Sequence, residues 1–102
     1  MAIVAVSVVP IGTDSTSVSS YVAGAEKILR EDGRVTFRLG PMFTTVEGDL
    51  GDCIDVVRKM HESLFTAGAM RVSTLVKIDD RRDRDATMDS KVHSVESKLK
   101  PA

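Results

Sequence analysis

The order of the hydrophobic patterns constrains the fold most strongly, because an apolar strand and an amphipathic helix follow each other twice along the chain. Residues 2–9 are a short, β-branched apolar run that ends at Pro10, which is typical of a buried strand. Residues 18–32 then repeat apolar side chains at helical spacing. We expect Ser17 to cap this helix and Gly33 to end it. The chain therefore begins with a strand that leads into a helix.

The same pattern resumes after this helix. Residues 35–48 alternate apolar and polar side chains on either side of a Gly-Pro break, which favours two antiparallel strands. Residues 50–67 form the clearest amphipathic helix, with Asp49 as its expected N-cap. Residues 70–78 predict a fourth strand, and residues 88–100 predict a shorter terminal helix.

These elements fit one small domain. A chain of 102 residues that is 42% hydrophobic has enough apolar material for one core, so we predict a single domain over residues 1–102. Right-handed crossovers in two strand-helix-strand halves place both helices on one face of a four-stranded antiparallel sheet. The sequence therefore predicts an α+β, ferredoxin-like βαββαβ sandwich followed by a C-terminal helix over residues 88–100.

Charge and cysteine content narrow the classes of function. Fourteen Lys and Arg against fifteen Asp and Glu give a net charge of -1, which disfavours nucleic acid as a partner. The expected sheet also lacks the paired aromatic residues that stack RNA bases. The lone Cys53 allows no internal disulfide, and no Cys/His cluster has metal-binding spacing, so we expect no metal and a reducing, cytoplasmic setting. The N-terminal apolar run is too short to span a membrane and carries no basic leader.

Strand parity predicts which side chains face the helices and which face away. The helix-facing set is apolar and comprises Val4, Val6, Val8, Val35, Phe37, Leu39, Val72, Val76 and Ile78. The opposite face mixes Ile, Val, Leu and Phe with small polar side chains. A purely solvated face usually carries fewer large apolar residues, so we infer that another copy of the chain covers this face.

A pocket at such an interface needs a few polar groups that converge. The candidates on the open face are Ser7, Thr45, Glu47 and Ser73. Glu47 is the most informative, because a carboxylate among apolar neighbours needs a partner if it is buried. Each of Thr45 and Ser73 alone is as readily an ordinary strand residue. No activated nucleophile or histidine base accompanies them, so the set favours ligand binding over catalysis.

The charged stretch "VKIDDRRDRD" at residues 76–85 is dense in charge, but its acidic and basic residues balance over residues 77–85. We interpret Asp79, Asp80, Arg81 and Arg82 as a salt-bridged latch, either within the chain or across a subunit interface. A cation site built from its aspartates is disfavoured by the adjacent arginines.

Two residues with reactive side chains, and four methionines, are interpreted as structural rather than functional. His61 and Cys53 lie on the apolar stripe of the helix at residues 50–67, which favours a satisfied core or interface histidine and a core cysteine. Met42, Met60, Met70 and Met88 are most simply packing residues.

Three motifs are similar to those of a known family: "VVPIGTDSTSVSSYV", "MFTTVEG" and "RVSTLVKIDDRRD". Together they resemble the small thiamine-binding proteins, relatives of the YkoF-type proteins. The resemblance implies a ferredoxin-like protomer, a homotetramer arranged as a dimer of dimers, and binding of thiamine or its hydroxymethylpyrimidine moiety without catalysis or cofactor. Met42, Thr44 and Glu47 match the family's middle motif, which adds Thr44 to the candidate ligand residues although parity turns it toward the helices.

Two positions depart from that family. Phe43 stands where the family has Gly, and Ala5 stands where relatives often have an acidic residue. The alternative hypothesis is therefore an oligomeric regulatory or scaffold module that keeps the fold without this ligand. A small acyl-phosphate hydrolase on the same fold is least favoured, because the chain has no Asn to pair with Arg.

Overall fold

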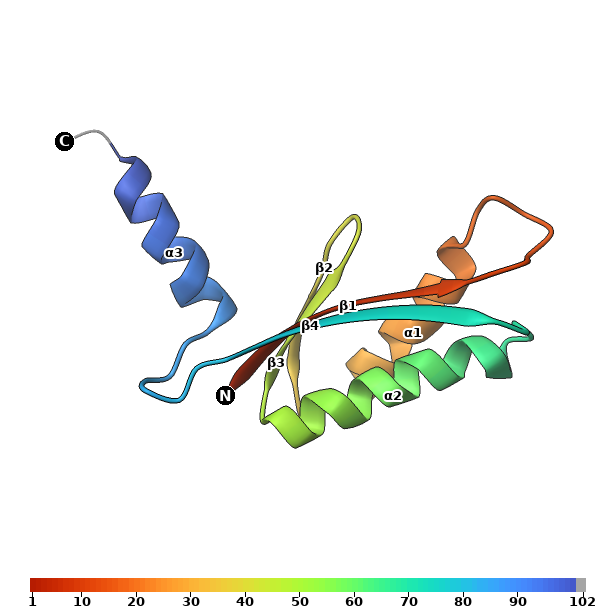
Figure 1. The fold of residues 1–102 in the computed structure, drawn as a ribbon, viewed down its shortest axis with the longest axis horizontal. Helices are drawn as coiled ribbons and strands as arrows, with labels where there is room; N and C mark the ends of the chain where they lie inside the picture. The colour runs from red at the N-terminus through yellow and green to blue at the C-terminus, as the bar shows by residue number, and fades with distance from the viewer. Residues whose placement is uncertain (101–102) are drawn as a thin grey trace.

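The computed structural model describes residues 1–100, so the last two residues of the predicted domain lie outside the described part (Figure 1). The strands are β1 (Ala2–Pro10), β2 (Thr36–Leu39), β3 (Thr44–Gly48) and β4 (Val72–Asp80). The helices are α1 (Ser19–Asp32), α2 (Leu50–Thr66) and α3 (Met88–Leu99). The strands form one antiparallel sheet in the order β2-β3-β1-β4. The predicted α+β, ferredoxin-like arrangement with a C-terminal helix is confirmed.

The core lies between the sheet and the two helices α1 and α2, which cover the same face (Figure 1). From the central strand β1, Val4 and Val6 point into this layer and are almost fully buried. They meet Leu29 of α1 and Leu64 of α2, which are buried to the same degree. Alternation along β1 therefore fixes the helix-covered face as predicted, because every second side chain enters the core.

The ends of α1 and α2 test the helix-capping residues that the sequence predicts. The side chain of Asp49 accepts a hydrogen bond from the Asp52 N–H at 3.2 Å, so the predicted N-cap of α2 is confirmed. Gly33 ends α1 with φ 75°, a left-handed conformation that favours glycine. The prediction of Ser17 as N-cap of α1 is wrong: Val18 occupies that position without a side-chain hydrogen bond. The Ser17 N–H instead bonds the hydroxyl of Ser15, in the turn that precedes the helix.

The edges of the sheet are less covered than parity suggested. Leu39 on β2 is 60% exposed, and Val76 and Ile78 on β4 are 36% and 45% exposed. Val76 pairs with Val6 and Ile78 with Val4, so both share the helix-side face but extend beyond the helices. The packing expected of Met42 and Met70 is also wrong, because both are strongly exposed. Parity selects the face of a side chain, whereas coverage depends on where the helices lie.

Helix α3 begins with a capping box, in which Thr87 and Ser90 each accept the other's backbone N–H. Beyond its first turn the helix projects away from the sheet and the other helices (Figure 1). Its predicted apolar stripe is present, but Val92, Val95 and Leu99 are exposed. Within residues 1–100, no helix combines the length and the apolar character that a membrane crossing requires.

Candidate functional site

The open face of the sheet carries the predicted polar residues, but they do not form one cluster. On this face Thr45 pairs with Ala5 and Ser73 pairs with Val9, while Ser7 lies between them on β1. The three hydroxyl-bearing residues therefore follow a diagonal across β3, β1 and β4. Glu47 lies at the opposite end, paired with Ile3. Since six residues of extended strand span about 20 Å, Glu47 and Ser73 do not share a small pocket within one chain.

Glu47 has a partner of its own at the start of α3. Its Oε2 atom accepts a hydrogen bond from the Met88 N–H at 2.7 Å. A carboxylate at a helix N-terminus is favoured by the unpaired amides and by the helix dipole. Asp89 accepts a bond from Arg38 of β2 at 2.6 Å, and Lys91 bonds Asp79 of β4. This end of the sheet face therefore anchors the first turn of α3.

The charged stretch after β4 forms local ion pairs. Arg82 bonds Asp80 at 2.9 Å, and Arg81 bonds Asp83 at 2.7 Å. The Lys91 ammonium lowers the pKa of Asp79, and the Arg81 guanidinium lowers the pKa of Asp83 to about 2. These carboxylates are thus matched by cations of the same chain. That they also bridge subunits stays a prediction.

A different arrangement lies on the helix side of the sheet, between α1 and the β2–β3 hairpin. Thr44 is buried there, as parity predicted, and its hydroxyl donates to Oε1 of Glu26. Glu26 is only 8% exposed. Its second oxygen, Oε2, is buried and finds no hydrogen-bond partner among residues 1–100. Buried carboxylate oxygens are rarely left unpaired, because their desolvation is then uncompensated.

Glu26 lines two hollows of this region, which share several lining residues. An outer crevice of about 840 Å³ runs along α1, with Val22 and Pro41 among its apolar walls and Lys27 and Arg30 among its polar ones. A small recess of about 80 Å³ continues beside Thr44 and is also lined by residues of the motif "MFTTVEG". The outer volume lies within the range of small-molecule pockets, about 300–1,000 Å³. We call this region the Glu26 crevice.

Glu26 was not among the residues selected from the sequence. The helical spacing contained a signal, because position 26 follows Val22 by four residues and precedes Leu29 by three. It therefore belongs to the buried stripe of α1. A carboxylate in an apolar stripe is unusual enough to mark a candidate site.

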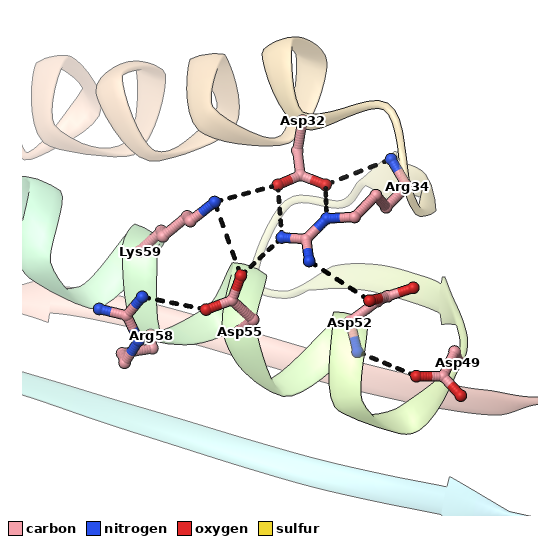
Figure 2. Close-up of polar contacts among 7 residues, drawn as sticks. All are labelled: Asp32, Arg34, Asp49, Asp52, Asp55, Arg58 and Lys59. Carbon is pink, nitrogen blue, oxygen red and sulfur yellow. Dashed lines mark hydrogen bonds and ion pairs between the residues drawn. The ribbon is translucent and has the colours of Figure 1, made fainter.

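A second charged cluster joins the end of α1 to α2 (Figure 2). The guanidinium of Arg34 contacts Asp32 at 2.8 Å, Asp52 at 3.3 Å and Asp55 at 2.6 Å. Lys59 reaches Asp32 and Asp55 as well. Arg34 holds the pKa of Asp32 well below its usual range and lowers the pKa of Asp55 to about 2. Each of these carboxylates has a cationic partner, so the cluster stabilises the helix pair and offers no free ligand group.

The two reactive side chains of α2 also have structural explanations. His61 Nδ1 lies 2.6 Å from the hydroxyl of Thr74 on β4, and its ring packs edge-on against Phe65. The interpretation of His61 as a satisfied histidine is confirmed. Cys53 is fully buried, and burial raises the pKa of its thiol.

The fold and the crevice define a small ferredoxin-like protein with a ligand-sized depression beside a buried carboxylate. Residues 4–96 match the model of the thiamine-binding protein family, and the chain belongs to that family. It is 45% identical to the UPF0045 protein YqgV of Bacillus subtilis, over 99% of this chain and 100% of the relative. It is 47% identical to a UPF0045 protein of Staphylococcus xylosus, over 97% and 95% of the two chains. The crystal structure of protein MJ1052 from Methanocaldococcus jannaschii is similar with a TM-score of 0.84, 29% identity, and coverage of 93% and 96%.

Proposed function

We propose that this protein binds thiamine, or its hydroxymethylpyrimidine moiety, without converting it chemically. The observation that carries the proposal is the match of residues 4–96 to a family of thiamine-binding proteins, which spans β2, β3 and β4 and most of β1 and α3. The polar groups available in the fold suit this ligand. An aminopyrimidine presents an N–H donor and ring acceptors, which carboxylate and hydroxyl groups can pair.

Two surfaces offer such groups. The first is the predicted sheet face with Ser7, Thr45, Glu47 and Ser73, where a second subunit would have to complete a pocket. The second is the Glu26 crevice, which includes the predicted residue Thr44. Neither surface pairs a nucleophile with a base, which supports binding rather than catalysis.

We also propose self-association, as a homotetramer built from two dimers. Leu75 and Val9 are exposed on the open sheet face, and α3 presents the exposed residues Val92 and Val95. A 12-residue helix is marginally stable in water without a packing surface, so α3 would gain from one on another copy. The buried free thiol of Cys53 suits a reducing compartment, and a cytoplasmic location is part of the proposal.

Calorimetric titration of the full chain with thiamine and with hydroxymethylpyrimidine tests the proposed function. We expect saturable heat with at least one of the two ligands. Absence of binding to both at millimolar concentration would refute it. Light scattering on the same samples measures the number of subunits, and a monomer at tens of micromolar would contradict the proposed assembly.

A scaffold or regulatory module without this ligand is the second candidate. It is favoured by one observation, that the Glu47 carboxylate already pairs with the Met88 N–H at the start of α3. Under this alternative the sheet face serves assembly alone. An assembled protein that binds neither compound would favour the scaffold, whereas a thiamine-type ligand retained through purification from cells would exclude it.

A further inference from the structure

We propose that two copies of this chain join edge to edge through β4, whose free side pairs antiparallel with the same side of β4 in the second copy and makes one continuous sheet. Leu75 of one copy lies opposite Leu75 of the other. The pairing deepens the proposed self-association, on which it rests, because it names the surface and the register that hold two subunits together. It does not depend on which ligand the protein binds.

β4 is an edge strand with an unused side. In the order β2-β3-β1-β4 it pairs with β1 from Val72 to Asp80, and its other side has no strand partner among residues 1–100. It is nine residues long, whereas β2 at the opposite edge has four. A long edge leaves a row of backbone N–H and C=O groups open to another chain, and proteins usually interrupt such edges with proline or a bulge. Because β4 has no proline and its register with β1 is unbroken, its backbone is suited to receive another strand.

The side chains of β4 are apolar on both faces of the sheet. Val76 and Ile78 point to the helix side and are 36% and 45% exposed, and Leu75 points to the open face and is 61% exposed. A strand that is apolar on both faces is typical of the interior of a sheet. A neighbouring strand covers such side chains laterally, because facing residues have Cβ atoms about 4.5–5.5 Å apart. A second copy of β4 would supply this neighbour.

Symmetry and charge restrict the register of such a pair. A twofold axis perpendicular to the sheet keeps the helices of both copies on one side, so residues that face each other must share a face. Each allowed register therefore places one residue opposite its own copy. The register centred on Lys77 brings two ammonium groups together, and the register centred on Thr74 brings Arg71 to Lys77 of the second copy. Like charges directly opposite destabilise a sheet, so both registers are disfavoured.

The register centred on Leu75 matches apolar residues with apolar residues and joins opposite charges. On the open face Leu75 meets Leu75, and Arg71 meets Asp79 of the second copy. On the helix side Val72 meets Ile78. Cross-strand pairs of both kinds stabilise antiparallel sheets. The edge of β4 is therefore complementary to itself, which identifies a second copy of the chain as its partner.

Both members of the charged pair are available for it. Arg71 directly precedes β4, and its carbonyl oxygen accepts a hydrogen bond from the Ile11 N–H at 2.8 Å, which extends the pairing with the first strand to this residue. The side chain of Asp79 contacts Lys91 but remains 48% exposed. A carboxylate has two oxygens and can accept from a second cation, so Asp79 can hold Lys91 and an arginine of the second copy together.

The register centred on Val76 is the nearest rival. It places Leu75 opposite Lys77 and Val72 opposite Asp80, so that charged groups meet apolar ones in both pairs. Registers centred nearer either end of β4 pair fewer residues. The Leu75 register is therefore the one that the sequence of β4 favours.

Cysteine cross-linking of the full chain tests the register. Facing residues of an antiparallel pair have Cα atoms about 4.5–5.5 Å apart, which suits a disulfide. Leu75→Cys alone should therefore give a covalent dimer under mild oxidation, seen on a non-reducing gel. Ser73→Cys and Lys77→Cys should each give no covalent dimer when expressed alone and should give one when co-expressed, because position 73 faces position 77. The unmodified chain is the control for Cys53, which is fully buried and common to every variant.

A pair of lysine substitutions on opposite edges tests the surface itself. Leu75→Lys places two like charges opposite each other and should raise the dissociation constant of the dimer about tenfold or more in analytical ultracentrifugation. Leu39→Lys is the matched control, because Leu39 lies on β2 at the other edge and is 60% exposed, nearly the same fraction as Leu75. It should change the dissociation constant by less than about twofold. Equal weakening by both variants, or weakening by Leu39→Lys alone, would overturn the pairing.

The outcomes separate the pairing from the proposed function. Cross-links in the expected combinations, with assembly weakened by Leu75→Lys alone, support it. A link that forms more fully with Val76→Cys than with Leu75→Cys overturns the register. An assembled chain whose β4 variants form no link overturns the pairing while self-association stands. An unmodified chain that is a monomer in light scattering overturns pairing and assembly together, and thiamine binding by that monomer in calorimetry leaves the ligand function standing.

Discussion

A pair of identical substitutions, Gly40→Ala and Gly24→Ala, should change stability in opposite directions. Gly40 begins the connection from β2 to β3, and a Cβ added there would lie 2.5 Å from the carbonyl oxygen of Phe43. Ordinary contacts begin at 3.4 Å, so the hairpin backbone would have to move by about 0.9 Å. Gly24 lies inside α1, and its added Cβ would meet nothing within 4 Å.

The expected magnitudes follow from these contacts. Overpacking against backbone costs about 1–3 kcal/mol, which we expect for Gly40→Ala. Alanine is favoured over glycine in a helix interior, so Gly24→Ala should stabilise by about 0.5–1 kcal/mol. For a domain of this size each 1 kcal/mol shifts the melting temperature by about 4–8 °C.

Urea unfolding followed by circular dichroism, at one protein concentration, measures both differences. Because the contact at Gly40 is with backbone rather than with a flexible side chain, no rotamer change can relieve it. A Gly40→Ala variant within about 0.5 kcal/mol of the unmodified chain would refute the steric reasoning. If both variants are destabilised, the expected gain in stability from alanine at position 24 is wrong.

Three other outcomes follow from the packing and the ion pairs. Leu64→Ala should cost about 2–5 kcal/mol in urea unfolding, because this fully buried side chain would leave a cavity between α2 and the sheet; a cost below about 1 kcal/mol would contradict that packing. The lowered pKa values of Asp32 and Asp55 mean that their ionised forms stabilise the fold above the unfolded-state pKa of about 4. This stability should be lost as pH falls toward 2, since the pKa of Asp55 in the folded chain is about 2. Melting temperatures between pH 7 and pH 2 measure the loss, and a flat profile would count against the cluster in Figure 2. Asp79→Ala removes the contact with Lys91 and should reduce assembly in light scattering while ligand affinity stays within about twofold; an intact assembly with lost binding would reverse this assignment.

Local signals in the sequence succeeded where neighbouring residues alone determine the structure. Asp49 caps α2 as predicted, because the acceptor and its amide are three residues apart and need no distant partner. Ser17 fails as a cap because the helix begins one residue later: Val18 occupies the N-cap position, and the Ser17 hydroxyl lies 3.4 Å from the hydroxyl of Ser19. Helical periodicity locates the helix but does not fix its first residue to within one position.

Properties that depend on contacts between distant elements were harder to predict from the sequence. Parity assigned Val76 and Ile78 to the correct face, but the sequence does not reveal that α1 and α2 leave the β4 edge uncovered. Parity likewise placed Ser73 and Glu47 on one face, while the strand register puts them at opposite ends. Convergence of side chains on different strands depends on register, which hydrophobic alternation leaves open.

The residues of the motif "MFTTVEG" contribute to both faces of the sheet, because side chains alternate along a strand. Thr44 and Val46 point to the helix side, where Thr44 bonds Glu26 and Val46 fills the core. Thr45 and Glu47 point to the open face, where Glu47 holds the first amide of α3. The same five-residue strand therefore connects the Glu26 crevice to the surface that positions the terminal helix.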